Sequence, residues 1–383
     1  MRSIANVADY RVAARRRLPR FLFDYIDGGA LTERTLAANA AELQAIGFRQ
    51  RVMSGVGAVD LSTAVLGESL ALPVILAPIG LGGLTARRGE VQAARAARTA
   101  GVPFTLSTVA LCSVEEVARE GGTAPWFQLY VTRDRGFMRA MLARAQAAGC
   151  RTLVFTVDMS LPGIRYRDRR SGLSGGTRLR RALRLRAQAL RRPRWACDVG
   201  LLGRPLVLGN LAELLGRGAG VENFWGWMAD NFDPTVTWRD LDEVRAHWSG
   251  TLIIKGVLEP EDARAAVAAG AQGVVVSNHG GRQLDGADAA ITALPAIVEA
   301  MGDRAAVLMD GGIRSGADVV RALALGARAV LIGRPWVWAL GACGQRGVTH
   351  LLDLLAQEMR LTMALTGVAS VDGINRSLLS GRR

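Results

Sequence analysis

Short apolar runs alternate along the chain with alanine- and arginine-rich stretches of helical character. Most of these runs show no polar–apolar alternation, which is typical of strands buried on both faces. The predicted strands are residues 74–80, 104–108, 126–130, 152–158, 252–256, 273–278, 306–311 and 329–333. Helices are predicted at residues 90–100, 114–119, 137–148, 260–269, 316–325 and 351–366. This repetition predicts an α/β fold around a parallel sheet.

Eight parallel strands with crossover helices favour a closed (β/α)8 barrel, the TIM barrel, over an open doubly wound sheet. In such barrels the functional residues gather at the carboxyl ends of the strands. Polar residues stand at those ends: Thr108, Gln128, Tyr130, Thr156, Asp158, Lys255, His279, Asp310 and Arg334. A dinucleotide-binding sheet would carry a GxGxxG turn after its first strand, and none follows residues 74–80. We expect one domain over residues 1–383, with the barrel at about 70–370.

About ninety residues separate the fourth and fifth predicted strands, so an insertion is expected after strand 4, at about residues 170–235. Residues 178–190 predict an amphipathic helix with arginines around one apolar stripe. The stripe consists of Leu179, Leu183, Ala187 and Leu190. Further apolar residues follow, namely Trp195, Leu201, Leu202, Phe224, Trp225 and Trp227. This pattern is typical of a helix in an anionic membrane interface. A solvated, disordered linker is the alternative, and nucleic-acid binding has no recognisable motif to support it.

The composition is that of a folded protein, with 50% hydrophobic and 21% charged residues. No apolar run is long enough to span a membrane, and the first residues lack the apolar stretch of a secretory signal. The four cysteines lie far apart without a CxxC pair, which indicates reduced thiols in a cytosolic compartment and no metal site. Eight arginines between residues 178 and 194 supply more than half of the net charge, since 14 − 8 leaves +6.

Lysine occurs once. Of the 48 basic residues, 47 are arginine and only Lys255 is lysine. It follows an apolar run, where a cation is costly to bury without a partner. A compact ammonium acts as a point charge, whereas a guanidinium is a broad fork. The sequence therefore favours a functional site at Lys255 over the chance survival of a lysine at a strand end.

The strongest local signal is the polar turn at residues 277–283, which follows a buried strand. His279 would point toward the barrel mouth, and Arg282 lies three residues later near the same opening. An imidazole can take a proton as a general base, and a guanidinium can hold a carboxylate with two hydrogen bonds. Asp158, at the end of the fourth strand, would orient the imidazole and stabilise its protonated form. The pattern suits the oxidation of a 2-hydroxy acid.

Two further segments indicate a phosphate site. Residues 310–314 follow the seventh strand and contain Gly311, Gly312 and Arg314, and Gly333 and Arg334 follow the eighth. Loops after strands seven and eight often form the phosphate site of such barrels. Glycine-rich turns offer backbone N–H groups, and arginines add charged donors.

These motifs carry a family resemblance. The chain resembles the FMN-dependent L-2-hydroxy-acid oxidases and dehydrogenases nearly from end to end. The resemblance rests on residues 23–30, 76–78, 126–130, 156–158, 254–256, 277–285 and 310–314. Residues 277–285 are highly specific to this family.

The resemblance implies a role for each site residue. His279 would be the base, assisted by Asp158, and Tyr130 would bind the substrate hydroxyl. Tyr25, Arg165 and Arg282 would hold the substrate carboxylate. The FMN contacts would be Ala77, Pro78, Ile79, Ser107, Gln128, Thr156, Lys255, Asp310, Gly311, Gly312, Arg314, Gly333 and Arg334. No residue is expected to bind a metal.

Within the family, residues 21–23, 132–139 and 231–234 most resemble the bacterial L-lactate dehydrogenases. Val109 stands where plant-type glycolate oxidases carry tryptophan, which leaves more room. The expected reaction is oxidation of L-lactate to pyruvate, by a hydride or a carbanion route. The electrons would pass to a quinone of the respiratory chain, from a homo-oligomer held peripherally on the cytoplasmic side of the cell membrane. The alternatives are an oxidase that releases hydrogen peroxide, a mandelate-type dehydrogenase, and a scaffold protein on a degenerate barrel.

Overall fold

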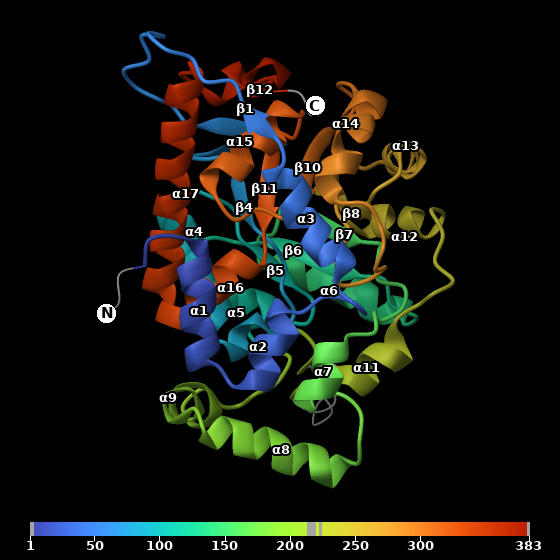
Figure 1. The fold of residues 1–383 in the computed structure, drawn as a ribbon. Helices are drawn as coiled ribbons and strands as arrows, with labels where there is room; N and C mark the ends of the chain where they lie inside the picture. Colours follow the sequence, from blue (N-terminus) through green and yellow to red (C-terminus); the bar gives the residue numbers. More distant parts are fainter. Residues whose placement is uncertain (1–3, 213–219, 222–223, 381–383) are drawn as a thin grey trace.

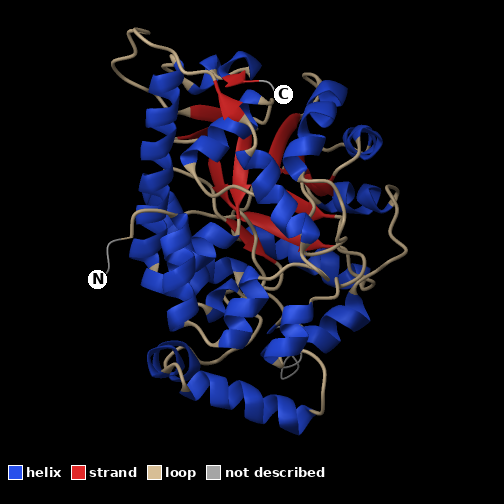
Figure 2. Cartoon of the chain, viewed as in Figure 1, coloured by secondary structure: helices blue, strands red, loops and turns tan. Residues whose placement is uncertain are grey.

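The computed structural model describes residues 4–212, 220–221 and 224–380. Eight parallel strands form one sheet that curves around an axis, with helices outside it (Figures 1 and 2). Their order is β4-β11-β10-β9-β8-β7-β6-β5, and a bridge between Leu76 and Phe104 joins the two end strands. The predicted (β/α)8 barrel is therefore confirmed.

Each predicted strand and helix overlaps an observed one. The barrel strands are β4 (Val74–Leu76), β5 (Thr105–Ser107), β6 (Trp126–Tyr130), β7 (Thr152–Thr156), β8 (Thr251–Val257), β9 (Gly273–Val276), β10 (Ala306–Asp310) and β11 (Ala329–Ile332). The outer helices are α4 (Gly89–Thr99), α5 (Val114–Gly121), α6 (Arg135–Ala147), α12 (Asp240–His247), α13 (Pro260–Ala268), α14 (Ala290–Met301), α15 (Gly316–Ala324), α16 (Arg334–Cys343) and α17 (Gln345–Thr366). The first strand ends four residues earlier than predicted. Pro78 has no N–H to donate to the ladder, and the chain turns into the barrel mouth there.

One end of the barrel is closed by a hairpin of β2 (Thr63–Val65) and β3 (Glu68–Leu70). The apolar interior consists of Val65, Leu70, Ile75, Ala77, Trp126, Val154, Ile253, Val275, Leu308, Ala329 and Leu331. The carboxylate of Glu68 accepts hydrogen bonds from Trp126 Nε1 and Thr152 Oγ1, both at 3.0 Å. Trp126 and Thr152 begin their strands, so the hairpin seals the amino-terminal end and leaves the carboxyl-terminal mouth for chemistry.

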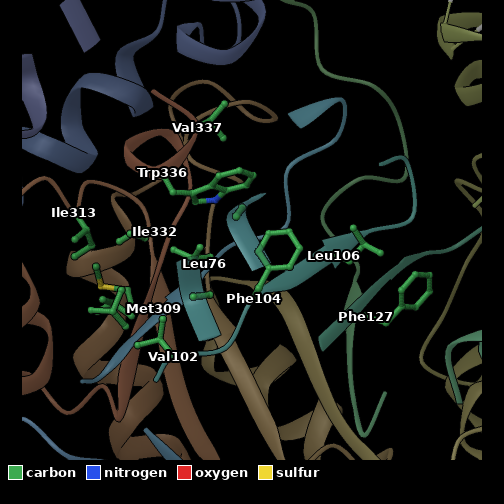
Figure 3. Packing of buried hydrophobic residues seen from close by; sticks show 14 of the residues in the cluster. Leu76, Val102, Phe104, Leu106, Phe127, Met309, Ile313, Ile332, Trp336 and Val337 are labelled. Carbon is green, nitrogen blue, oxygen red and sulfur yellow. The ribbon is translucent and has the colours of Figure 1, made fainter. Parts of the chain in front are cut away.

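A second apolar layer lies between the strands and the helices (Figure 3). Phe104 meets Trp336 edge to face, with ring centroids 5.9 Å apart. Trp336 Nε1 donates to the carbonyl oxygen of Ala77 at 3.1 Å. The tryptophan thereby fixes the backbone just beyond β4, where the chain enters the mouth.

Three helices precede the barrel, namely α1 (Val7–Arg17), α2 (Arg20–Asp27) and α3 (Arg34–Gln44). The short strand β1 (Gly47–Phe48), which follows these helices, pairs with β12 (Leu379–Ser380) beside the barrel. The amphipathic helix α2 carries Tyr25 and Ile26 to the carboxyl-terminal mouth of the barrel, where both side chains line a cavity.

The predicted insertion lies between β7 and β8. Its helices are α7 (Tyr166–Ser171), α8 (Arg178–Leu190), α9 (Pro193–Trp195), the π-helical segment Ala196–Leu201, and α11 (Phe224–Asn231). Helix α8 runs along the end of the molecule opposite β1 and β12 (Figure 1). The predicted aromatic residues Phe224, Trp225 and Trp227 have side chains outside the described part of the structure. Among the described residues, no helix is both long and apolar enough to cross a bilayer.

Candidate active site

A cavity opens at the carboxyl-terminal mouth of the barrel and has about 960 Å³ of empty space, part of it open to solvent. Several of the expected site residues line it: Tyr25, Ala77, Pro78, Ile79, Tyr130, Arg165, Lys255, His279, Arg282, Asp310, Gly311, Gly312, Arg314, Gly333 and Arg334. Segments more than 300 residues apart in the sequence therefore converge on one cavity.

His279 and Asp158 form a pair at the edge of this cavity. His279 Nδ1 lies 2.9 Å from Asp158 Oδ1, which leaves Nε2 as the nitrogen without this partner. His279 has a left-handed backbone, with φ of 56°, and its N–H donates to Ser277 Oγ at 3.0 Å. A Cβ on Gly256 would lie 2.5 Å from the Cβ of Asp158, so glycine is required beside the carboxylate. The turn thus aims the imidazole in a geometry typical of an orienting carboxylate and a general base.

The electrostatics of this pair suit a base that is neutral at neutral pH. Burial lowers the pKa of His279 below its usual 6.5, although Asp158 acts in the opposite direction. Burial raises the pKa of Asp158, but the nearby charges of His279 and Lys255 outweigh it and leave that pKa lowered. The carboxylate therefore stays charged and can stabilise an imidazolium when a proton arrives.

Two arginines of the cavity lie close to the ring of the same tyrosine, Tyr25. The guanidinium of Arg165 lies 5.6 Å and that of Arg282 lies 5.0 Å from the ring centroid of Tyr25. Arg282 is also fixed by its Nη1, which donates to the carbonyl oxygens of Tyr25 at 2.7 Å and Gly28 at 2.9 Å. Burial and then the charge of Arg165 lower the pKa of Arg282 to about 10. Arg165 Nη1 also lies 3.8 Å from Asp168 Oδ2, so one buried carboxylate balances part of the charge. The two cations held close together still form a suitable site for an anionic ligand.

Tyr130 completes this side of the cavity. Its ring packs against Phe232 with centroids 5.1 Å apart, and burial raises the pKa of its hydroxyl. The phenol therefore remains protonated and can donate a hydrogen bond to a ligand. Met159 and Met228 also line the cavity and were not predicted from the sequence. Met228 comes from α11, so the insertion contributes to the site.

The single lysine is buried and paired. Lys255 is 4% exposed, and its Nζ lies 3.0 Å from Asp310 Oδ2 and 2.9 Å from Ser277 Oγ. Burial lowers the pKa of Lys255, but the charges of Asp310 and Asp158 outweigh this effect and leave it raised. Lys255 is therefore a fixed positive charge in the cavity. Ser277, which the sequence did not single out, joins Lys255 to the backbone of His279.

Three of the expected cofactor contacts lie below the cavity lining in a buried chain of hydrogen bonds. Ser107 Oγ donates to Gln128 Oε1, and Gln128 Nε2 donates to Thr156 Oγ1, each at 3.0 Å. They stand on the adjacent strands β5, β6 and β7. Each of these three side chains orients the next one, so the chain presents hydrogen-bond donors and acceptors to the mouth in a fixed arrangement.

Glycines and arginines gather at the other end of the cavity. Gly311 and Gly312 have φ of 92° and 83°, and a Cβ on Gly312 would lie 2.1 Å from the carbonyl oxygen of Asn39. Arg314 lies over the ring of Trp338 at 5.1 Å. Among the described residues, neither Arg314 nor Arg334 forms an ion pair with a carboxylate.

The charge at this end fits a phosphate. Burial lowers the pKa of Arg314 to about 10. Burial, and then the charges of Arg282 and Arg314, lower the pKa of Arg334 well below its usual value. A bound dianion would relieve this mutual repulsion and accept from both guanidinium groups. The lining suits FMN, because arginines at one end could bind its phosphate and Lys255 could lie beside its ring.

Fold and site together describe a (β/α)8 barrel whose mouth holds a histidine–aspartate pair and buried arginines at both ends of one cavity. The sequence model of the FMN-dependent dehydrogenase family matches residues 14–381. The chain belongs to this family, and FMN is its cofactor. The family membership and the cofactor expected from the sequence are confirmed.

Individual relatives agree with this placement. The L-lactate dehydrogenase of Caulobacter vibrioides is 60% identical over 379 residues, which cover 99% of this chain and 98% of that protein. The L-lactate dehydrogenase of Pseudomonas syringae pv. syringae is 57% identical over 98% of each chain. Among solved structures, the monotopic membrane protein (S)-mandelate dehydrogenase has a TM-score of 0.92 at 35% identity, covering 99% of this chain and 100% of that one. A mandelate oxidase has a TM-score of 0.84 at 41% identity, over 98% of both chains.

Proposed function

We propose that this enzyme oxidises L-lactate to pyruvate, with His279 as the base. The observation that carries the proposal is the cavity in which the His279–Asp158 pair faces the clamp of Arg282, Arg165 and Tyr25. The relatives named L-lactate dehydrogenase support it, because their similarity covers nearly the whole chain.

Each side chain has one task in the reaction. Arg282 and Arg165 hold the substrate carboxylate, and Tyr130 donates to its hydroxyl oxygen. His279 Nε2 takes the hydroxyl proton, and the charge of Asp158 stabilises the imidazolium that results. When bound, FMN would supply the acceptor for the two electrons and the hydrogen of the Cα–H bond. Lys255 supplies the fixed positive charge that favours a reduced, anionic ring.

The residues that would hold FMN divide by chemistry. Arg314, Arg334 and the backbone N–H groups at Gly312 and Gly333 would bind its phosphate. Asp310 would accept from ribityl hydroxyls. The remaining contacts, to the ring and the ribityl chain, would come from Ala77, Pro78, Ile79, Ser107, Gln128, Thr156, Lys255 and Gly311.

Substitution of His279 tests the proposal. His279→Gln should keep bound FMN but lose L-lactate-dependent flavin bleaching by a factor of about 10² to 10⁴, as expected when a general base is removed. His247→Gln is the matched control, because His247 is exposed on the outer helix α12 and its Nδ1 lies 2.9 Å from the Glu243 carbonyl oxygen. Bleaching by His279→Gln at the wild-type rate would exclude His279 as the base.

The substrate side chain faces Val109, Met159 and Met228, which make an apolar subsite without charge. A mandelate-type specificity is the second candidate, because two structural relatives are a mandelate dehydrogenase and a mandelate oxidase. Steady-state kinetics with L-lactate, L-2-hydroxybutyrate and (S)-mandelate separate the two. A kcat/KM at least about tenfold higher for mandelate than for lactate, or roughly 1.4 kcal/mol, would overturn the lactate assignment.

Quinone is the proposed electron acceptor, and an oxygen-using oxidase is the alternative. The proposal is supported by the relatives named dehydrogenases. Peroxide yield and reduction of a soluble quinone analogue are compared under air. Stoichiometric peroxide with little quinone reduction would favour the oxidase.

Helix α8 supports peripheral attachment to the cytoplasmic face of a membrane. Leu179, Leu183 and Leu190 are 71%, 56% and 78% exposed. The polar Gln188 instead faces the protein, where it accepts from the N–H of Phe21 at 2.8 Å and donates to the carbonyl oxygen of Ser171 at 2.8 Å. The apolar side of the helix therefore points away from the body, and arginines flank it as in helices that lie on anionic membranes.

Vesicle binding tests this attachment. The triple variant with Leu179, Leu183 and Leu190 replaced by serine should lose binding to anionic vesicles and retain lactate-dependent flavin reduction. Leu361→Ser is the matched control, because Leu361 is 62% exposed on α17. Undiminished vesicle binding by the triple variant would reject α8 as the membrane contact. We also propose a closed homo-oligomer, which light scattering of the purified enzyme would measure.

A further inference from the structure

The carboxyl-terminal turn of α2 holds two of the cavity arginines through its backbone. Arg282 Nη1 donates to the carbonyl oxygens of Tyr25 and Gly28. Arg334 donates from Nε to the carbonyl oxygen of Asp27 at 3.2 Å and from Nη2 to that of Gly28 at 2.9 Å. The carbonyl groups at the end of a helix carry partial negative charge, so they attract cations. One turn thus sets the position of an arginine from the β9 loop and of another from the end of β11.

The side chain of Asp27 anchors this turn. Its Oδ1 accepts from Arg11 Nε at 2.6 Å, and its Oδ2 accepts from Arg11 Nη2 and Arg167 Nη1, both at 2.7 Å. Asp27 is 3% exposed. Arg11 belongs to α1 and Arg167 to α7, so the carboxylate joins α2 to the amino-terminal helix and to the insertion. The bidentate bond to Arg11 fixes direction as well as distance.

The packing at Gly28 shows how close this junction is. A Cβ at that position would lie 2.7 Å from the Asp24 carbonyl oxygen and 3.2 Å from Cδ of Arg167. The absence of a side chain therefore lets Arg167 approach the turn. Arg167 Nη2 also donates to Glu33 Oε2 at 2.5 Å, and Glu33 Oε1 accepts from the N–H of Gly29 at 2.9 Å. Both ends of the turn are held.

Asp27 is also a buried anion that acts on the arginine cluster, although the charge of Asp318 has a larger effect on Arg314. Its charge favours the protonated forms of Arg314 and Arg334, whereas the arginines disfavour one another. Burial raises the pKa of Asp27, but the hydrogen bonds and charges of Arg11 and Arg167 outweigh it and leave that pKa lowered. The carboxylate is therefore ionised at neutral pH and offsets part of the positive charge before an anion binds.

We propose that Asp27 is a positioning residue that aligns Arg334 with the cofactor phosphate and Arg282 with the substrate carboxylate through the turn they share. The inference rests on the proposed function, which gives these two arginines their ligands. A buried ion pair by itself is weak evidence for a contribution to stability. What distinguishes Asp27 is that its own backbone, and that of the next residue, hold the arginines.

The Asp27→Asn variant tests whether Asp27 positions the arginines or only stabilises the fold. Asp27→Asn should raise the Kd of FMN by about ten- to a hundredfold, as expected when one or two charge-assisted hydrogen bonds weaken. The Kd of riboflavin, which lacks the phosphate, should change less than about twofold. Both are measured by titrating the apoprotein and following the quenching of flavin fluorescence. With FMN saturating, KM for L-lactate should rise more than kcat falls.

Asp24→Asn is the matched control, because Asp24 lies on the same helix and its ion pair is with Arg20, whose side chain is 64% exposed. The control should leave all four quantities within about twofold of wild type, as is usual for a pair with a solvent-exposed partner. Equal losses of FMN and riboflavin affinity in Asp27→Asn would overturn the proposal, and so would an unchanged FMN affinity. If Asp27→Asn does not fold, Arg11→Gln removes one partner of the carboxylate at a half-exposed position and is judged by the same FMN-to-riboflavin ratio.

Measurements on the wild-type enzyme distinguish a failure of the proposed phosphate site from a failure of the proposed role of Asp27. Equal affinities of the wild type for FMN and riboflavin would contradict the phosphate site of the proposed function. A wild-type preference for FMN that Asp27→Asn retains would contradict only the role of Asp27.

Discussion

Asp158→Asn isolates the electrostatic contribution of the carboxylate, because asparagine has nearly the same shape and no charge. The two atoms of the pair are 2.9 Å apart. For unit charges at that distance, Coulomb's law gives about 6 kcal/mol with an effective dielectric constant of about 20. Asparagine retains a hydrogen bond, and solvent and protein rearrange, so we expect roughly half of this energy to be lost from the imidazolium. About 3 kcal/mol corresponds to a fall in the rate of proton transfer of about 10²-fold.

The assay is stopped-flow bleaching of the enzyme-bound flavin by L-lactate without oxygen, at several pH values. The acid limb of the wild-type rate should lie at or below the ordinary pKa of histidine, because burial lowers the pKa of His279. Removal of the Asp158 charge should move that limb to still lower pH, since the carboxylate raises the pKa of His279. A rate within about threefold of wild type, or roughly 0.7 kcal/mol, together with an unmoved limb would refute the reasoning.

Three other substitutions test separate parts of the structure. Lys255→Met should destabilise the protein by about 3–5 kcal/mol in urea unfolding, because it leaves Asp310 buried without its cation, and adding Asp310→Asn should restore part of that loss without restoring activity. A Lys255→Met protein as stable as wild type would contradict the ion-pair argument. Asp168→Asn should raise KM for L-lactate by about tenfold, because Asp168 is 3% exposed and its charge acts on Arg165 and Arg282; an unchanged KM would count against it. Glu68→Gln should cost about 1–3 kcal/mol in stability and leave kcat unchanged, because Glu68 lies at the closed end of the barrel. A lower kcat there would show that the sealed end affects the chemistry.

The fold could be predicted because most barrel strands are runs of mainly apolar, buried residues. Residues 273–276 are buried throughout, and a strand covered on both faces leaves a continuous hydrophobic run in the sequence. The strand ends were harder to place. Residues 77–80 continue the apolar run but leave the sheet, because the direction of the chain there depends on Pro78 and on Trp336, which lies far away in sequence.

The site could be predicted where several of its groups are close in sequence. His279 and Arg282 lie within one turn, so their chemistry was visible together in the sequence. The role of Ser277, which links Lys255 to this turn, was not visible. Asp27 acts through contacts with Arg11 and Arg167, and only the folded chain brings these three together.

The amphipathic pattern of α8 was also ambiguous before the structure. An apolar stripe at helical spacing predicts a helix but does not state whether the stripe packs against the protein. The structure answers this for the described residues, since Leu179 and Leu183 are exposed and Gln188 faces inward.

The central claim is that the enzyme removes two electrons and two protons from one enantiomer of lactate, with the hydroxyl proton going to His279 and the electrons going to FMN. Anaerobic mixing of the purified holoenzyme with L-lactate or D-lactate tests it most directly. L-lactate should bleach the flavin and yield one pyruvate for each FMN reduced, whereas D-lactate should leave the flavin oxidised. A fully FMN-loaded enzyme that L-lactate does not bleach, or that D-lactate bleaches equally fast, would contradict the assigned substrate and the arrangement of base and clamp.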